Sequence, residues 1–191
     1  RDNGSDAGTP PRAGSAVRIF LSERDAGRAK RRLDAAREYN EGLDLVSQRN
    51  YAAAVPKFER AAKLDPDFRD ASFNLALSYD KLGLHRKAIP LLEDLVSFSP
   101  GNGEYRYALG ASHFAAGANG EAEEAFRELL SREPGNRKAL FSLAVVLEKR
   151  GSLEEAKSRF REYLAVDPRG EWADAARTHL DAMLRAGGGA R

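Results

Sequence analysis

Four prolines stand at a constant interval in this chain, since Pro66, Pro100, Pro134 and Pro168 are separated by 34 residues each. The same register aligns an alanine in every unit, and a large apolar residue four positions later, so whole segments repeat. The alanines are Ala54, Ala88, Ala122 and Ala156, and the large residues are Phe58, Leu92, Phe126 and Phe160. The register divides the chain into four units without insertions: 35–68, 69–102, 103–136 and 137–170. Such a chain is expected to fold by stacking one unit on the next.

Each unit is expected to form two helices joined by a short turn. Apolar residues recur at three- and four-residue spacing, and no segment alternates as a strand would. Glycine stands at the turn in three units, and Arg49 with Asn50 stands there in the first. The glycines are Gly83, Gly117 and Gly151. Glycine readily adopts the left-handed conformation that ends many helices. The sequence therefore predicts an all-α fold of antiparallel helix pairs.

The order of these residues resembles the tetratricopeptide repeat (TPR) family. In that family a large residue, a leucine and a small residue mark the first helix, Ala and Phe mark the second, and Pro marks the end. The corresponding first-helix residues here are Glu41, Leu75, Leu109 and Leu143, followed by Gly42, Ala76, Gly110 and Ala144. The first unit, with Glu41, fits this pattern least well. The resemblance covers residues 35–170 and implies a right-handed α-solenoid, the TPR-like superhelix.

Segments outside the repeats are expected to cap and extend the solenoid. Residues 171–186 predict a capping helix, and residues 22–34 predict an N-terminal helix leading into the first unit. The buried side of the cap is expected to carry Trp172, Ala176, Leu180 and Met183 or Leu184. Residues 1–21 are expected to be a disordered or partly ordered tail, and residues 187–191 a disordered one. Within the first tail, the apolar segment Val17–Leu21 is a hypothetical ligand for a groove of its own or another copy.

Composition argues against several classes of function. Charged residues make up 31% of the chain at a net charge of +2, without the strong basic field of a nucleic-acid binder. There is no cysteine, and His85, His113 and His179 lack the spacing of metal ligands. We therefore expect no enzyme, no metal and no cofactor, and interpret His113 as a packed, hydrogen-bonded core residue. No apolar run approaches the roughly 20 residues that span a bilayer.

The resemblance implies that a protein or peptide partner binds the concave face formed by the first helices. The family's groove positions correspond here to an aromatic residue in every unit and to mainly apolar residues one to two turns later. They are Tyr39, Leu43, Phe73, Leu77, Tyr107, Ala111, Phe114, Phe141 and Val145. Aromatic anchors offer a large contact area at low entropic cost. The predicted ligand is an apolar or amphipathic segment, with a purely structural role for the aromatic residues as the alternative.

Two other functions fit the same pattern. The exposed ends are compatible with a homo-oligomeric scaffold, and the repeats are compatible with a regulatory domain of a longer protein. A family subclass clamps the C-terminal carboxylate of chaperone peptides, and its clamp positions fall here on Tyr39, Leu43, Asn74, Glu104 and Tyr107. Only Asn74 matches, and Glu104 would repel a carboxylate. The sequence leaves the compartment open between cytoplasm and periplasm.

Overall fold

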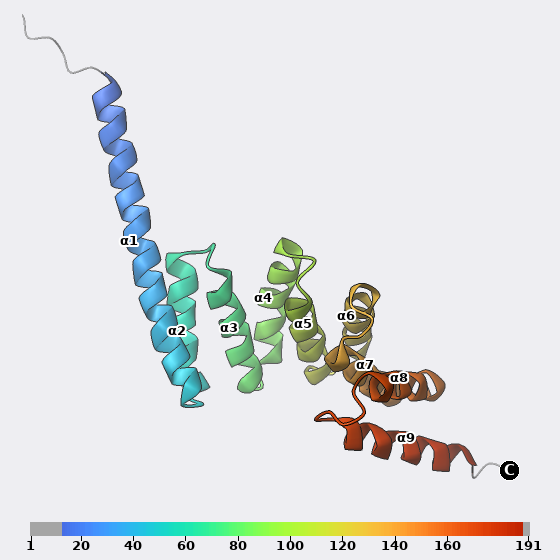
Figure 1. Cartoon of the computed structure of the whole chain (residues 1–191). Coiled ribbons are helices and arrows are strands. Elements are labelled where there is room, and N and C mark those ends of the chain that lie inside the picture. The colour runs from blue at the N-terminus through green and yellow to red at the C-terminus, as the bar shows by residue number, and fades with distance from the viewer. Residues whose placement is uncertain (1–12, 189–191) are drawn as a thin grey trace, which may run out of the picture.

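The computed structural model describes the backbone of residues 13–188 and the side chains of residues 24–185. Within that part of the chain every regular element is an α-helix (Figure 1). The helices are α1 Ala13–Ser47, α2 Tyr51–Leu64, α3 Arg69–Lys81, α4 His85–Phe98, α5 Gly103–Ala115, α6 Asn119–Arg132, α7 Arg137–Lys149, α8 Leu153–Val166 and α9 Ala173–Gly188. The predicted all-α class is confirmed.

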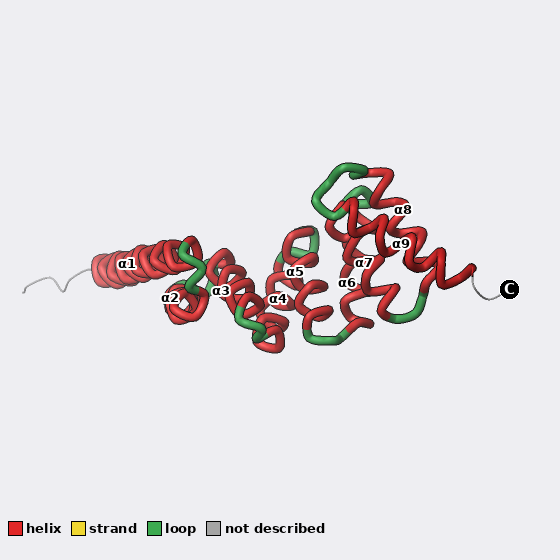
Figure 2. The backbone as a smooth tube through the Cα atoms, turned by 90° about the horizontal axis from the view of Figure 1, so that it is seen from below, coloured by secondary structure: helices red, strands yellow, loops and turns green. Residues whose placement is uncertain are grey.

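The helices pack in the order in which they occur along the chain, joined by short loops (Figure 2). The pairs α1/α2, α3/α4, α5/α6 and α7/α8 form the four units, and α9 packs on α8. First helices of neighbouring units also touch, α3 with α5 and α5 with α7. The result is a TPR-like solenoid in which the first helices share one face and the second helices share another.

The turn inside every unit has the same left-handed residue. Gly83, Gly117 and Gly151 have φ angles of 74°, 83° and 81°, and Arg49 takes the equivalent place in the first unit with φ 57°. The next residue, Asn50, accepts a hydrogen bond from the amide of Ala53 and so caps α2. The predicted helix stop is therefore present in the first unit without a glycine.

Arg49 is expected to carry a conformational cost that its three glycine counterparts avoid. A left-handed conformation costs an L-residue about 1–2 kcal/mol in the folded state. Glycine avoids this cost, but it also gives the unfolded chain more conformational entropy, which offsets part of the gain in stability. Arg49→Gly should therefore raise the free energy of unfolding by about 0.5–1 kcal/mol, measured by denaturant titration. Gln48→Gly, next to it in the chain, is the control and should not stabilise. An Arg49→Gly protein no more stable than the wild type would contradict this reading.

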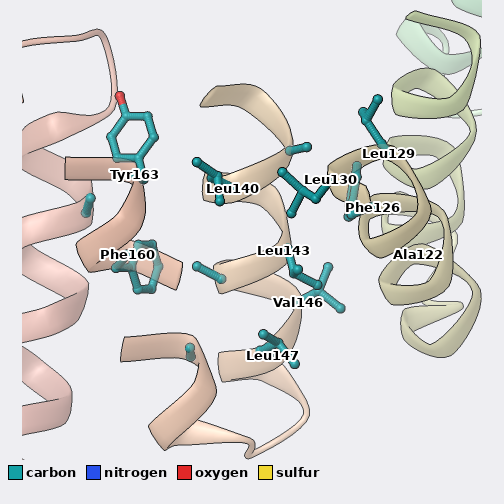
Figure 3. Packing of buried hydrophobic residues seen from close by; sticks show 14 of the residues in the cluster. Ala122, Phe126, Leu129, Leu130, Leu140, Leu143, Val146, Leu147, Phe160 and Tyr163 are labelled. Carbon is teal, nitrogen blue, oxygen red and sulfur yellow. The ribbon is translucent and has the colours of Figure 1, made fainter. Parts of the chain in front are cut away.

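Small residues bring the two helices of each unit close together. Ala54, Ala88, Ala122 and Ala156 are all fully buried, as their position in the repeat predicts. At Gly110 an added Cβ atom would lie 2.7 Å from a ring carbon of Phe126, and at Gly42 it would lie 2.6 Å from Phe58. Figure 3 shows the core that results, with Phe126 of α6 and Phe160 of α8 on either side of α7. Close helix packing thus depends on residue size at a few repeat positions.

The N-terminal end of the solenoid presents a polar face to solvent. Ala71, Leu75 and Ser78 of α3 are buried against the preceding unit. The first unit has polar residues at the equivalent places, namely Arg37, Glu41 and Asp44. Glu41 forms an ion pair with Lys57 of α2. The poor fit of Glu41 to the repeat pattern is consistent with its place on α1, because no other helix in the described part of the chain packs on that side.

Helix α1 is 35 residues long and begins well before the expected residue 22. Figure 1 shows its N-terminal part projecting past α2. Helix formers such as Arg, Lys, Ala and Leu dominate residues 18–36, so nothing in that stretch stops the helix. Arg32 and Arg28 anchor it to the loop after α2 through Asp65 at 3.3 Å and Asp67 at 3.7 Å. Residues 13–21, including Val17–Leu21, lie in this helix, but their side chains are outside the described part, as are residues 1–12 and 189–191.

The C-terminal helix covers the last unit. Ala173, Ala176 and Met183 of α9 are buried, while Leu184 is 47% exposed. The sequence left Met183 and Leu184 as alternatives, and the structure selects Met183. Trp172, just before α9, stacks on Phe141 with the ring centroids 5.4 Å apart. The outward residues Asp174, Thr178 and Asp181 are exposed and polar, so this end also faces solvent.

A candidate partner-binding face

The predicted groove residues lie on α1, α3, α5 and α7, and we call this surface the first-helix face. Most of its aromatic rings pack against a ring of the second helix of their own unit, which covers part of their surface. Tyr39 lies 5.7 Å from Phe58, Tyr107 lies 5.6 Å from Phe126, and Phe141 lies 5.7 Å from Phe160, measured between ring centroids. The repeat places each pair at the same two positions, and these three first-helix rings remain half-buried.

Phe73 departs from this pattern. Leu92 stands where the other units have Phe, so Phe73 packs instead on Tyr105 of the next unit, with ring centroids 4.9 Å apart. Only 9% of Phe73 is exposed. The expected ladder of aromatic anchors is therefore interrupted at the second unit, and Phe73 mainly supports the fold.

Two tyrosine hydroxyls connect neighbouring units. The Tyr39 hydroxyl accepts a hydrogen bond from the side-chain amide of Asn74 at 3.1 Å. The Tyr107 hydroxyl and Ser142 Oγ are 3.3 Å apart in the equivalent arrangement two units later. Burial raises the pKa of Tyr39, and the negative charge of Asp70 adds to the effect. Asn74, the single residue that matched the carboxylate clamp, is thus occupied by an inter-unit contact.

The apolar part of the face that stays accessible lies one to two turns after the aromatic residues. We call it the apolar strip, and it consists of Leu43, Leu77, Ala111, Phe114 and Val145. Leu43 is 37% exposed and the other four are half-buried. The Lys149 ammonium lies 5.1 Å from the centroid of the Phe114 ring, which marks one border of the strip. A ligand on this face would therefore contact aliphatic side chains and one aromatic ring more than a full aromatic ladder.

Acidic residues near the C-terminal ends of the first helices are already paired. Asp80 of α3 accepts a hydrogen bond from Ser112 of the next unit, and its other oxygen lies 2.9 Å from His85 Nδ1. Glu148, two units later at the same repeat position, lies 2.7 Å from His179 Nδ1 of α9. The repeat register puts Asp80 and Glu148 on the first-helix face, at the position of Phe114, but it does not reveal these partners. The sequence signal for these contacts is that an acid recurs at this repeat position, as Asp80 and Glu148.

Acidic residues in the first turns of α3 and α5 are not paired in this way. Asp70 and Glu104 are exposed, and neither forms an ion pair with any residue whose side chain the structure describes. Burial raises the pKa of Tyr105, and the nearby charges of Asp70 and Glu104 raise it further. Glu104 also lines a polar pocket beside Tyr107, with Glu133 and Lys138 among its other walls. At this edge the carboxylates of Asp70 and Glu104 form no ion pair with a described side chain, although Arg137 and Lys138 line the same pocket as Glu104.

The described residues contain no arrangement that suggests catalysis or metal binding. Among them no group of three or more His, Asp or Glu side chains is placed to hold a metal ion. The prediction for His113 was wrong in one respect: it is half-buried, and its Nδ1 has no hydrogen-bond partner. Its repeat equivalent Tyr79 reaches Glu59 at 2.6 Å, which the shorter imidazole does not reproduce. Between residues 13 and 188, no helix has both the length and the apolar character of a membrane span.

Two tetratricopeptide repeat models match the sequence, one over residues 39–103 and the other over residues 113–180. Together these ranges cover most of the chain. The chain therefore belongs to the tetratricopeptide repeat family, a class of protein–protein interaction modules. No curated protein matches the sequence.

Solved structures with the same fold include YrrB and MamA. YrrB, described as a TPR protein with an unusual peptide-binding site, superposes with a TM-score of 0.70 at 23% identity, covering 75% of this chain and 74% of that one. Residues 41 to the end of MamA from Desulfovibrio magneticus RS-1 give a TM-score of 0.68 at 22% identity, covering 72% and 78%. The MamA structure designated AMB-1 gives 0.67 at 25% identity, covering 72% and 81%. These likenesses establish the solenoid fold.

Proposed function

We propose that the protein is a non-catalytic interaction module that binds an apolar or amphipathic segment of a partner protein on the first-helix face. The observation that carries the proposal is the apolar strip, which runs across four successive first helices. Apolar side chains that stay partly accessible at the same repeat positions of successive units, in a solenoid whose ends are polar, support an interaction site there. The family to which the chain belongs supports the same class of function.

The composition of the strip favours a helical or extended segment over a charged tail. Leu43, Leu77 and Val145 offer aliphatic surface, and Phe114 supplies one aromatic contact. Such a surface gains free energy mainly by removing apolar area from water, at about 25 cal/mol per Å². A ligand with apolar side chains at helical spacing presents a matching stripe.

The alternative of a homo-oligomeric scaffold built by stacking solenoids end to end is less well supported. Such a stack would have to bury charged residues that are exposed at the two ends, namely Arg37, Asp44, Asp174 and Asp181. Residues 24–33 of α1 are mostly exposed and offer a surface to a second copy. Light scattering across a concentration series measures that possibility directly.

The test uses peptides selected from a random displayed library against the intact protein. Ala111→Arg places a long charged side chain in the middle of the apolar strip and should weaken the selected peptides by tenfold or more. Ala165→Arg makes the same change at an exposed position of α8 and should leave their affinity unchanged. Equal binding by both variants, each shown to be folded by circular dichroism, would overturn the proposal.

A further inference from the structure

We infer that the first-helix face selects a helical partner segment by its charges, with basic residues on one flank and acidic residues on the other. The inference rests on the proposed function, because it concerns the ligand of the same face. Asp70 and Glu104 form one edge of the face, in the first turns of α3 and α5. Lys81 and Lys149 form the opposite edge, at the last residues of α3 and α7.

The charges on these two edges form no ion pair, unlike several charges on the second helices. On the second helices Arg127 pairs with Glu123 at 2.9 Å and with Glu155 at 2.7 Å, and Arg159 pairs with Glu162 at 2.7 Å. Hydrogen bonding to Arg127 holds the pKa of Glu155 below its ordinary value. Among the residues with described side chains, Asp70, Glu104 and Lys81 form no ion pair. Charges without an ion pair therefore stand at both edges of the apolar strip, where a ligand can pair with them.

Two acids beside the lysine edge already have partners within the protein. The acids that would interrupt the lysine edge are Asp80 and Glu148, and each lies against a histidine at 2.9 Å and 2.7 Å respectively. Lys149 stays beside Phe114, where its charge faces a ligand on the strip. The acidic edge ends at Lys138 in the fourth unit, which lies 5.8 Å from the Tyr107 ring. The basic residues of the ligand should therefore fall against α3 and α5.

Helix dipoles offer a simpler account of the same residues, since acids favour first turns and bases favour last turns. That account applies equally to Glu121, an exposed acid in the first turn of α6. Glu121 lies on the other face of the solenoid, away from the apolar strip. If both acids only complement a helix dipole, replacing Glu121 or Glu104 should have the same effect on peptide affinity. If the first-helix face recognises the ligand, only the replacement of Glu104 should lower that affinity.

The dimensions of the face fit a helix. Asp70 and Lys81 lie at opposite ends of α3, roughly 17 Å apart along its axis at 1.5 Å per residue. A helix with its side chains is about 10–12 Å across, so the charged ends of Arg or Glu on its flanks reach both edges. Neighbouring first helices pack at about 8–10 Å, close to the distance between helical residues seven apart. The inferred ligand carries two basic residues seven positions apart on one flank and acidic residues on the other.

The experiment compares two synthetic helical peptides with the same leucine stripe. One carries Arg at two positions seven apart on one flank and Glu at two such positions on the other, and the second has Gln at all four. The charged peptide should bind about tenfold more tightly at low salt, and the advantage should shrink as salt rises. Asp70→Asn and Glu104→Gln should each weaken it about threefold, and Glu121→Gln should not. Equal affinity of the two peptides, or equal effects of Glu104→Gln and Glu121→Gln, would overturn the inference.

Rescue and site controls separate this inference from the proposed function. An Asp70→Lys, Glu104→Lys protein should bind a peptide whose arginines are replaced by glutamate better than it binds the original. If Ala111→Arg abolishes binding but the charge changes do nothing, the inference fails and the proposed function stands. If neither peptide is affected by Ala111→Arg, both fail. If Asp70→Asn and Glu104→Gln instead abolish self-association in light scattering, the occupant is a second copy, and the inference of a partner segment is overturned.

Discussion

Phe160→Ala is expected to lower the free energy of unfolding by about 3–5 kcal/mol, the usual cost of deleting a buried aromatic side chain. Phe160 is fully buried, and its ring lies 5.7 Å from Phe141 and 5.3 Å from His179. Its removal therefore leaves a cavity between α7 and α8 and also loosens the contact with α9. Denaturant titration followed by circular dichroism measures the loss, and the midpoint should fall with little change in slope.

Phe98→Ala is the matched control. Phe98 ends α4, is 63% exposed, and has the Arg69 guanidinium 4.1 Å from its ring centroid. Loss of this surface contact should cost less than about 1 kcal/mol. Similar destabilisation by the two substitutions would mean that the packing assigned to the fourth unit is wrong.

Ala122→Leu is expected to destabilise the protein by about 3 kcal/mol, because three more carbon atoms have no space between α5 and α6. Ala122 is fully buried in the conserved register of the repeat. The tightness of this helix pair is visible at Gly110, where even one added carbon would approach Phe126 to 2.7 Å. Thermal unfolding should show a clear drop in the midpoint.

Ala52→Leu tests the same chemical change at an exposed place in α2. There the larger side chain meets solvent, and the stability should change by less than about 0.5 kcal/mol. An unchanged midpoint for Ala122→Leu would show that the repeat register does not describe the packing.

Most of the fold follows from the 34-residue register, because the register fixes which side chains are small and where each helix stops. The register predicts a helix stop at Arg49 although no glycine stands there, and the positive φ of 57° at Arg49 confirms the stop. The start of α1 was harder to place. Residues 24–33 of the projecting helix are mostly exposed, so no buried apolar pattern leads back to the residue where the helix begins.

The chemistry of the face was less predictable than its position. The repeat register identified Tyr39, Tyr107 and Phe141, but their packing on second-helix rings depends on the distance between the two helices of a unit, which residue spacing does not reveal. The contacts of Asp80 with His85 and Ser112 join residues from two units, and the pairing of Glu148 with His179 requires the placement of α9. Contacts between side chains of different units can be identified only once the units are stacked in the three-dimensional structure.

The most direct test of the proposed function is a map of amide chemical-shift changes when a library-selected peptide is added to isotope-labelled protein. Changes should concentrate on α3, α5 and α7, around Leu77, Ala111 and Val145. The second helices α4, α6 and α8 should be affected much less. Changes confined to the second helices, or to the solenoid ends at α1 and α9, would contradict the assignment of the first-helix face as the binding surface.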